Sequence, residues 1–94
     1  MRYISFMEYC FEDFDKILEK EKRYEEEDKK FPGKYPKSIF PEHDMAGETR
    51  SFEVFEATPE QLLNETVFWA PEVKLKFVPI TESPKLTRAY QKSR

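Results

Sequence analysis

The segment 51–80 constrains the fold more than any other part of the chain, because its apolar pattern changes from one period to another and back. At its start, apolar Phe52 and Val54 are separated by Glu53. A strand places successive side chains on opposite faces of its sheet, so Phe52 and Val54 are expected to share one face. Glu53 and Phe55 are then expected on the other.

A helix start follows at Thr58. The Thr58 side chain can cap free N–H groups, and Pro59 at the first helical position lacks the N–H that would otherwise be unpaired. Gln61 stands where a capping box has Glu or Gln. Pro71 ends the helix, because the residue before a proline avoids the α region.

A second strand is predicted after this helix. Val73, Leu75 and Phe77 alternate with Lys74 and Lys76, so one face is apolar and the other basic. The segment 51–80 therefore predicts a strand, a short helix and a strand.

The first half of the chain supplies two further strands and a long helix. Arg2–Cys10 predicts a strand with Ile4 and Phe6 on one face, and Glu12 to about Lys30 predicts a helix with a narrow apolar stripe. A loop is expected over Phe31–Phe40. The segment Ile39–Met45 is the weakest strand, and Pro41 within it indicates an edge strand or a bulge. Ala46–Glu48 is expected to turn the chain into a strand at Thr49–Glu56.

The element order β-α-β-β-α-β predicts an α+β fold for residues 1–80. With right-handed crossovers it gives a ferredoxin-like four-stranded antiparallel sheet with both helices on one face. We expect the opposite face to carry Tyr3, Ser5, Met7, Tyr9, Glu53, Phe55, Lys74, Lys76 and Val78. Such a surface is too apolar to be left bare, so the sequence predicts a homodimer.

Residues 81–94 form a basic tail. This segment contains one acidic residue, Glu82, and four basic residues: Lys85, Arg88, Lys92 and Arg94. Ser83–Pro84 could begin a short helix there. The tail is interpreted either as solvated or docked in a dimer, or as a site for an anionic partner.

Composition excludes several classes of function. A net charge of −3 argues against general nucleic-acid binding, and the single cysteine, Cys10, excludes a disulfide framework and favours the cytoplasm. No apolar run is long enough for a signal peptide or a membrane span, so we expect no membrane partner. Charged residues make up 37% of the chain and Gln, Asn and Cys are scarce, a pattern that is more frequent in proteins from hot environments. The long acidic helix is the alternative source of much of this pattern.

The segments His43–Gly47, Arg50–Ala57 and Val73–Ile80, with Trp69 between the last two, resemble a family of uncharacterised proteins in the dimeric α/β-barrel superfamily. The resemblance implies a homodimer whose two sheets enclose a cavity. Related barrels include antibiotic-biosynthesis and haem-degrading monooxygenases, lactone isomerases and ligand-sensing domains. Fold alone does not choose among these functions.

Candidate site residues follow from the predicted cavity-side face. They are Tyr3, Ser5, Met7, Tyr9, His43, Glu53, Phe55, Lys74 and Lys76. As the only histidine, His43 could act as a general base, with a surface or packing role as the alternative. Glu53 and the two lysines fit either ion pairs or a small-molecule site, and the tyrosines fit either ligand binding or core filling. Trp69 is interpreted as a packing anchor or a stacking platform.

No metal or cofactor is expected, because the chain has one His, one Cys and no glycine-rich phosphate loop. Two functions remain open. One is a dimeric barrel that binds a small molecule, with a monooxygenase- or isomerase-like activity as a variant. The other is a non-enzymatic dimeric module that binds or regulates a partner.

Overall fold

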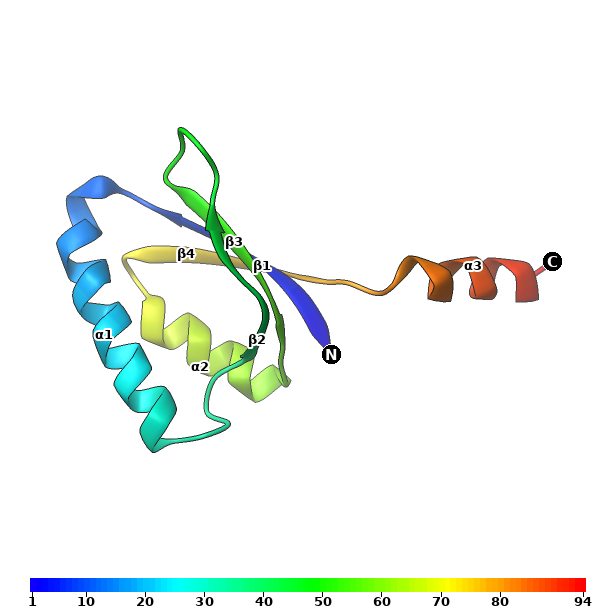
Figure 1. The fold of residues 1–94 in the computed structure, drawn as a ribbon, viewed down its shortest axis with the longest axis horizontal. Helices are drawn as coiled ribbons and strands as arrows, with labels where there is room; N and C mark the ends of the chain where they lie inside the picture. The colour runs from blue at the N-terminus through cyan, green and yellow to red at the C-terminus, as the bar shows by residue number, and fades with distance from the viewer.

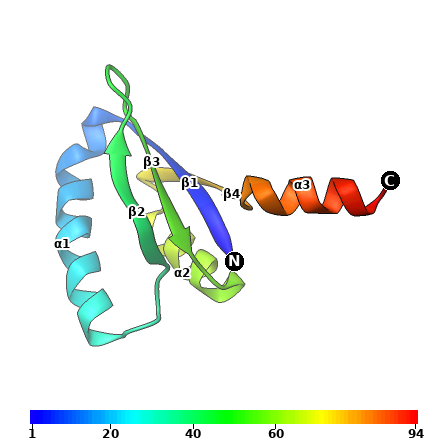
Figure 2. The same cartoon turned by 45° about the vertical axis from the view of Figure 1, so that its right-hand side comes forward.

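Four strands form a single antiparallel sheet in the computed structural model, which describes residues 1–94 (Figure 1). The strands are β1 (Arg2–Tyr9), β2 (Lys37–Asp44), β3 (Arg50–Glu56) and β4 (Val73–Pro79), in the spatial order β2-β3-β1-β4. The helices are a 3-10 turn (Phe11–Asp13), α1 (Phe14–Lys30), α2 (Pro59–Trp69) and α3 (Ser83–Lys92). The predicted α+β class and four-stranded antiparallel sheet are confirmed, and α1 and α2 lie over the same face of the sheet (Figure 2).

Helix α2 begins as the sequence predicts. Gln61 N donates to Thr58 Oγ1 at 3.2 Å, and Thr58 N donates to Gln61 Oε1 at 2.9 Å, which completes the capping box. Pro59 occupies the first turn. The helix ends at Trp69, two residues before Pro71.

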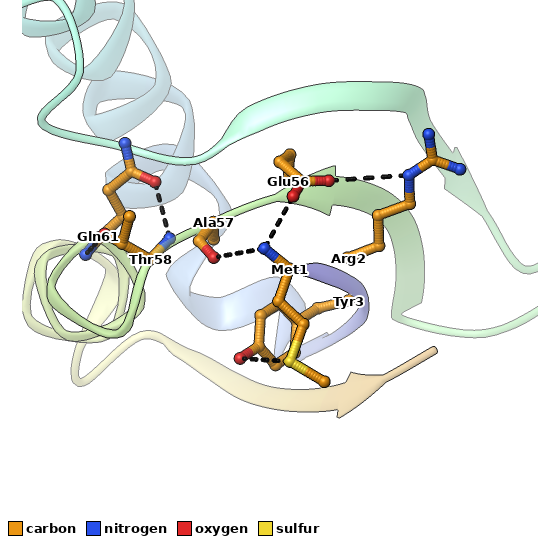
Figure 3. A network of polar contacts seen from close by, with 7 residues as sticks. All are labelled: Met1, Arg2, Tyr3, Glu56, Ala57, Thr58 and Gln61. Carbon is orange, nitrogen blue, oxygen red and sulfur yellow. Dashed lines mark hydrogen bonds and ion pairs between the residues drawn. The ribbon is translucent and has the colours of Figure 1, made fainter. Parts of the chain in front are cut away.

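The central strand β1 is tied to β3 beyond the last pair of the ladder (Figure 3). The Met1 ammonium group lies 2.7 Å from Glu56 Oε1 and 3.3 Å from Ala57 O, and Ala57 N donates to Met1 O at 2.9 Å. Arg2 Nε adds an ion pair to Glu56 Oε2 at 3.6 Å. These contacts hold the register at the end of β3 where the chain turns into α2.

The side of the sheet that the helices cover differs from expectation in β1 and β3. In both strands, the face that was expected to be open lies against the helices. Phe55 is therefore only 2% exposed, and Ser5 and Ser51 are each 1% exposed. The helix-facing residues of the two strands are Tyr3, Ser5, Met7, Tyr9, Ser51, Glu53 and Phe55. Strand β4 follows expectation, since Val73 is buried and Lys74 and Lys76 are exposed.

The open face of the sheet is apolar along its middle. Ile4 and Phe6 of β1 pair with Val54 and Phe52 of β3, and Ile4 also pairs with Val78 of β4. All five side chains keep intermediate exposure because no element of this chain covers them. The physical reason for the wrong assignment is that both faces of β1 and β3 carry large apolar groups, so alternation alone does not say which is inside.

Strand β2 is an edge strand, as Pro41 predicted. Its register against β3 shifts between Ser38 and Phe40 and again between Phe40 and His43, and the second shift spans the proline. Every residue of β2 is exposed. The strand therefore pairs with β3 but contributes little buried area.

The tail forms α3, which leaves the domain on the side opposite α1 (Figures 1 and 2). All residues from 81 to 94 are exposed. None of the helices combines the length and the apolar character needed to cross a membrane.

Replacing Phe55 by alanine should be among the most destabilising single changes. Its ring is 2% exposed and packs near Tyr3 and Phe77, at centroid distances of 6.5 and 5.7 Å. We expect a loss of about 3–5 kcal/mol in the free energy of unfolding, measured by urea denaturation. The matched change Phe31→Ala removes an exposed ring and should cost less than about 1 kcal/mol. Equal losses in the two variants would contradict this description of the core.

Candidate functional site

A cavity of about 880 Å³ lies between the helix-facing side of the sheet and helices α1 and α2. The sheet contributes Met7 and Tyr9 of β1, Ser51 and Glu53 of β3, and Val73 of β4. The facing walls come from α1, from Trp69 and Gln61 of α2, and from the loop 32–36. Its volume suits a small organic ligand, because such pockets typically measure about 300–1,000 Å³.

The ionisable lining of this cavity is almost entirely acidic. Six carboxylates reach it, against the single cation Lys37; they are Glu21, Glu25, Asp28, Glu42, Asp44 and Glu53. All except Glu53 belong to exposed residues, so they surround the mouth, and Glu53 lies deeper. No net positive charge inside the cavity balances this group.

Glu53 projects from the middle of β3 beneath the helices. Burial raises its pKa to about 7, with smaller contributions from the nearby carboxylates of Glu65 and Glu42. Next to it in β3, Ser51 is almost fully buried and donates its hydroxyl to Glu42 Oε2 at 2.9 Å. At neutral pH Glu53 can therefore give up or take a proton, or meet a cation.

Glu65 of α2 is 4% exposed and organises one wall of the cavity. Tyr24 of α1 donates its hydroxyl to Glu65 Oε1 at 2.5 Å, and Trp69 Nε1 donates to Glu65 Oε2 at 3.3 Å. Burial raises the pKa of Glu65 to about 7. Because its partners come from two helices, this carboxylate joins α1 to α2.

Aromatic rings build the rest of this wall. Tyr24 stacks on Trp69 at a centroid distance of 5.5 Å and on Tyr35 at 4.5 Å, and Phe68 meets Tyr24 edge-on at 5.3 Å. Tyr24, Tyr35 and Trp69 line the cavity directly. The ligand space is thus bounded by ring faces and edges as well as by carboxylates.

A lysine clamp joins α1 to the C-terminal end of α2, about one turn of α1 before Tyr24. Lys20 Nζ of α1 donates to Phe68 O at 3.0 Å, to Ala70 O at 2.8 Å and to Glu72 Oε2 at 2.7 Å. A cation at a helix C-terminus also interacts favourably with the helix dipole. The wall that faces the cavity is therefore held at two points along α1.

The cavity gathers only part of the predicted site. Met7, Tyr9 and Glu53 line it, whereas Tyr3, Ser5 and Phe55 face the helices outside its lining. Lys74 and Lys76 lie on the open face, where a shallower hollow of about 400 Å³ includes them. The predicted set is thus divided between the two sides of the sheet.

His43 lies on the open face as well. Its ring stacks on Phe40 at 4.6 Å and on Phe52 at 5.9 Å, and its Nδ1 is 2.7 Å from Pro41 O. Asp44 points to the opposite side and lines the cavity, so it does not orient the imidazole. A catalytic role of His43 stays a prediction that the cavity geometry does not support.

Sequence reasoning missed Glu65 and Tyr24 as parts of a site. A local signal for Glu65 existed, because Glu65 and Trp69 are four residues apart and therefore share a helix face. Nothing local shows that Tyr24 would come from α1 to complete the group. Trp69 was interpreted as a packing anchor or a stacking platform. It packs against Tyr24 in the wall, and it also lines the cavity.

Comparison with known proteins gives no match, either to a protein-family profile, to a curated protein or to a solved structure. The acidic side chains do not form a metal site, because no group of three or more His, Cys, Asp or Glu residues has the arrangement to hold a metal ion. The site is therefore interpreted from its own chemistry.

Stability should fall as the pH rises from 5 to 8. Glu53 and Glu65 have folded-state pKa values of about 7, above the ordinary 4.5, so the folded chain binds their protons more tightly than the unfolded chain. This contribution is complete below pH 4.5 and is lost as the pH passes 7. Glu53→Gln should flatten the profile and raise stability at pH 8 by about 1–2 kcal/mol, a value reduced for solvent screening.

Thermal unfolding followed by circular dichroism from pH 5 to 8 measures this effect. Glu27, Glu56 and Glu72 have lowered pKa values because of their hydrogen bonds to cations, so their titration falls below this window. The exposed change Glu19→Gln is the control and should keep the wild-type profile. A stability that increases steadily from pH 5 to 8 would contradict the burial of these carboxylates.

Proposed function

We propose that this protein binds a small organic cation in the cavity between the sheet and helices α1 and α2. The observation that carries the proposal is the cavity lining, which combines six carboxylates and one lysine with the rings of Tyr9, Phe14, Tyr24, Tyr35 and Trp69. An ammonium group gains from both, since carboxylates pair with it and aromatic faces attract it.

The deep carboxylate favours a cation over a neutral ligand. Glu53 loses hydration beneath the helices, and no lysine or arginine compensates it within an ion pair. A bound cation would supply the missing charge and lower the pKa of Glu53. The bound cation and the ionised carboxylate of Glu53 therefore stabilise each other. Protons compete with the cation for this carboxylate.

This location differs from the cavity expected between two sheets. The proposed ligand space lies inside one chain, beneath its own helices, and Met7, Tyr9 and Glu53 are the predicted residues that belong to it. The proposal is a binding function. An isomerase-like activity would use the same Glu53 as a proton acceptor, but no second acid or base is aligned with it by a hydrogen bond.

Benzyltrimethylammonium should bind and raise the melting temperature, whereas benzyl alcohol and phenylacetate should not. Its affinity, measured by isothermal titration calorimetry, should increase about tenfold from pH 5.5 to pH 8 as Glu53 ionises. Glu53→Gln should weaken binding at pH 8 by about tenfold and remove most of the pH dependence.

The control for this measurement is Glu19→Gln, which removes an exposed α1 carboxylate outside the cavity and should bind like the wild type. Equal binding of phenylacetate and the cation would contradict the proposal, because an acidic cavity repels an anion. Unchanged cation affinity in Glu53→Gln would place any binding elsewhere.

The fold and the open face further support a ferredoxin-like domain that works as a homodimer. The strand order β2-β3-β1-β4 with two helices on one face fits that arrangement. The opposite face exposes a continuous apolar band formed by Ile4, Phe6, Phe40, Phe52, Val54 and Val78. Packing this band against a second copy across a two-fold axis would remove it from water.

Sedimentation velocity tests the dimer. The wild-type chain should sediment as a dimer, and Val54→Lys should leave the chain folded but weaken its association by at least about tenfold, because a buried lysine would have no partner in the interface. Val67→Lys places the same change on the exposed side of α2, where Val67 is 76% exposed, and should leave the dimer intact. A monomeric wild-type chain at all accessible concentrations would contradict this packing.

A further inference from the structure

Helix α3 has no packing partner within its own chain. Leu86 is 68% exposed and Tyr90 is 57% exposed, and they lie four residues apart on one side of the helix. The only ion pair between the tail and the domain joins Glu82 to Arg2 at 3.5 Å, before the helix begins. A helix of ten residues is marginal in water without a surface to pack on.

A basic stripe runs along a different side of α3 from Leu86 and Tyr90. Lys85, Arg88 and Lys92 follow one another at intervals of three and four residues, which places them along one face of α3. None of the three forms an ion pair in the chain. The stripe is therefore available to an acidic surface.

The matching acidic stripe lies on α1 at the mouth of the cavity. Glu21, Glu25 and Asp28 are exposed, line the cavity and form no ion pair. Their intervals are four and then three residues. Placed antiparallel, the two helices align Glu21 with Lys92, Glu25 with Arg88, and Asp28 with Lys85, over about 10 Å of helix.

Charge on the two parts of the chain favours the same contact. Residues 81–94 contain four basic residues and one acidic residue, which gives this segment a net charge of +3. Because the whole chain has a net charge of −3, residues 1–80 have a net charge of −6. Burial raises the pKa of Glu21, and the nearby carboxylates of Glu42, Glu25 and Asp44 raise it further. Cations at the mouth would relieve this repulsion.

The helix is directed away from its own α1. Helices α3 and α1 lie at opposite ends of a molecule 53 Å long, and both views agree on this (Figures 1 and 2). Ile80 N is bonded to Arg2 O at 3.0 Å, so only Thr81 and Glu82 connect the sheet to α3. The acidic stripe within reach of α3 is therefore that of another molecule.

We infer that α3 is a docking arm that binds the α1 stripe of a second copy of this chain and closes the mouth of that copy's cavity. Lys85, Arg88 and Lys92 pair with Asp28, Glu25 and Glu21 of that copy. The inference depends on the mouth and not on the identity of a ligand, so it stands or fails independently of cation binding.

A charge swap tests the arm. One variant carries Lys85→Glu, Arg88→Glu and Lys92→Glu, and the other carries Glu21→Lys, Glu25→Lys and Asp28→Lys. Each variant alone opposes like charges and should self-associate at least about tenfold more weakly than the wild type in sedimentation equilibrium. Their mixture restores opposite charges at both arm contacts, so heterotypic association should return to near the wild-type level.

The matched control is Lys85→Arg with Lys92→Arg, which conserves the charge of the arm and should associate like the wild type. Either triple variant associating as tightly as the wild type would overturn the inference, and so would a mixture no tighter than its components. Circular dichroism confirms that each variant is folded.

A second measurement uses the unmodified chain. Equal amounts of nitrogen-14 and nitrogen-15 protein are mixed and treated with a carbodiimide, which joins a lysine amine to a carboxylate. Mass spectrometry should find mixed-isotope peptides that link Lys85 to Asp28 or Lys92 to Glu21. Tail cross-links that reach only other residues, or that always carry a single isotope, would overturn the inference.

Discussion

The buried carboxylate of Glu65 is the interaction on which the shape of the molecule depends. It accepts hydrogen bonds from Tyr24 on one helix and from Trp69 on its own, so it holds α1 beside α2 while α1 stands away from the sheet. An unpaired buried carboxylate would be costly, and these two donors reduce that cost. Without this group and the Lys20 clamp, α1 would lose the polar contacts that hold it beside α2.

Between this helix pair and the sheet, a chain of 94 residues leaves a cavity of about 880 Å³. The sheet below α1 presents Ser51 and Glu53 where a well-packed core would have large apolar groups. At this position, polar and ionisable side chains are buried, which is unfavourable for stability. Elsewhere, the helix cap, the strand ladders and the ion pair of the N-terminus are all favourable for stability. Such a concentration of unfavourable choices is typical of a functional site.

Features that depend only on neighbouring residues along the chain could be predicted from the sequence. The capping box at Thr58, the alternation in β4 and the irregular edge strand at Pro41 are all local, and the structure contains them. The faces of β1 and β3 could not be assigned, because Phe52 and Phe55 are both large and apolar. The cavity was also out of reach, since it depends on how α1 and α2 lie over the sheet, an arrangement between distant segments that has no local signature.

The irregular course of β2 restricts how the sheet can grow. A regular edge strand offers unpaired N–H and C=O groups to any extended segment, which invites continuous ribbons between molecules. Pro41 has no N–H to offer, and the register shifts around it interrupt the row of groups that an incoming strand would need. Along this margin, polymerisation by strand addition is disfavoured, and contacts between copies are left to side chains.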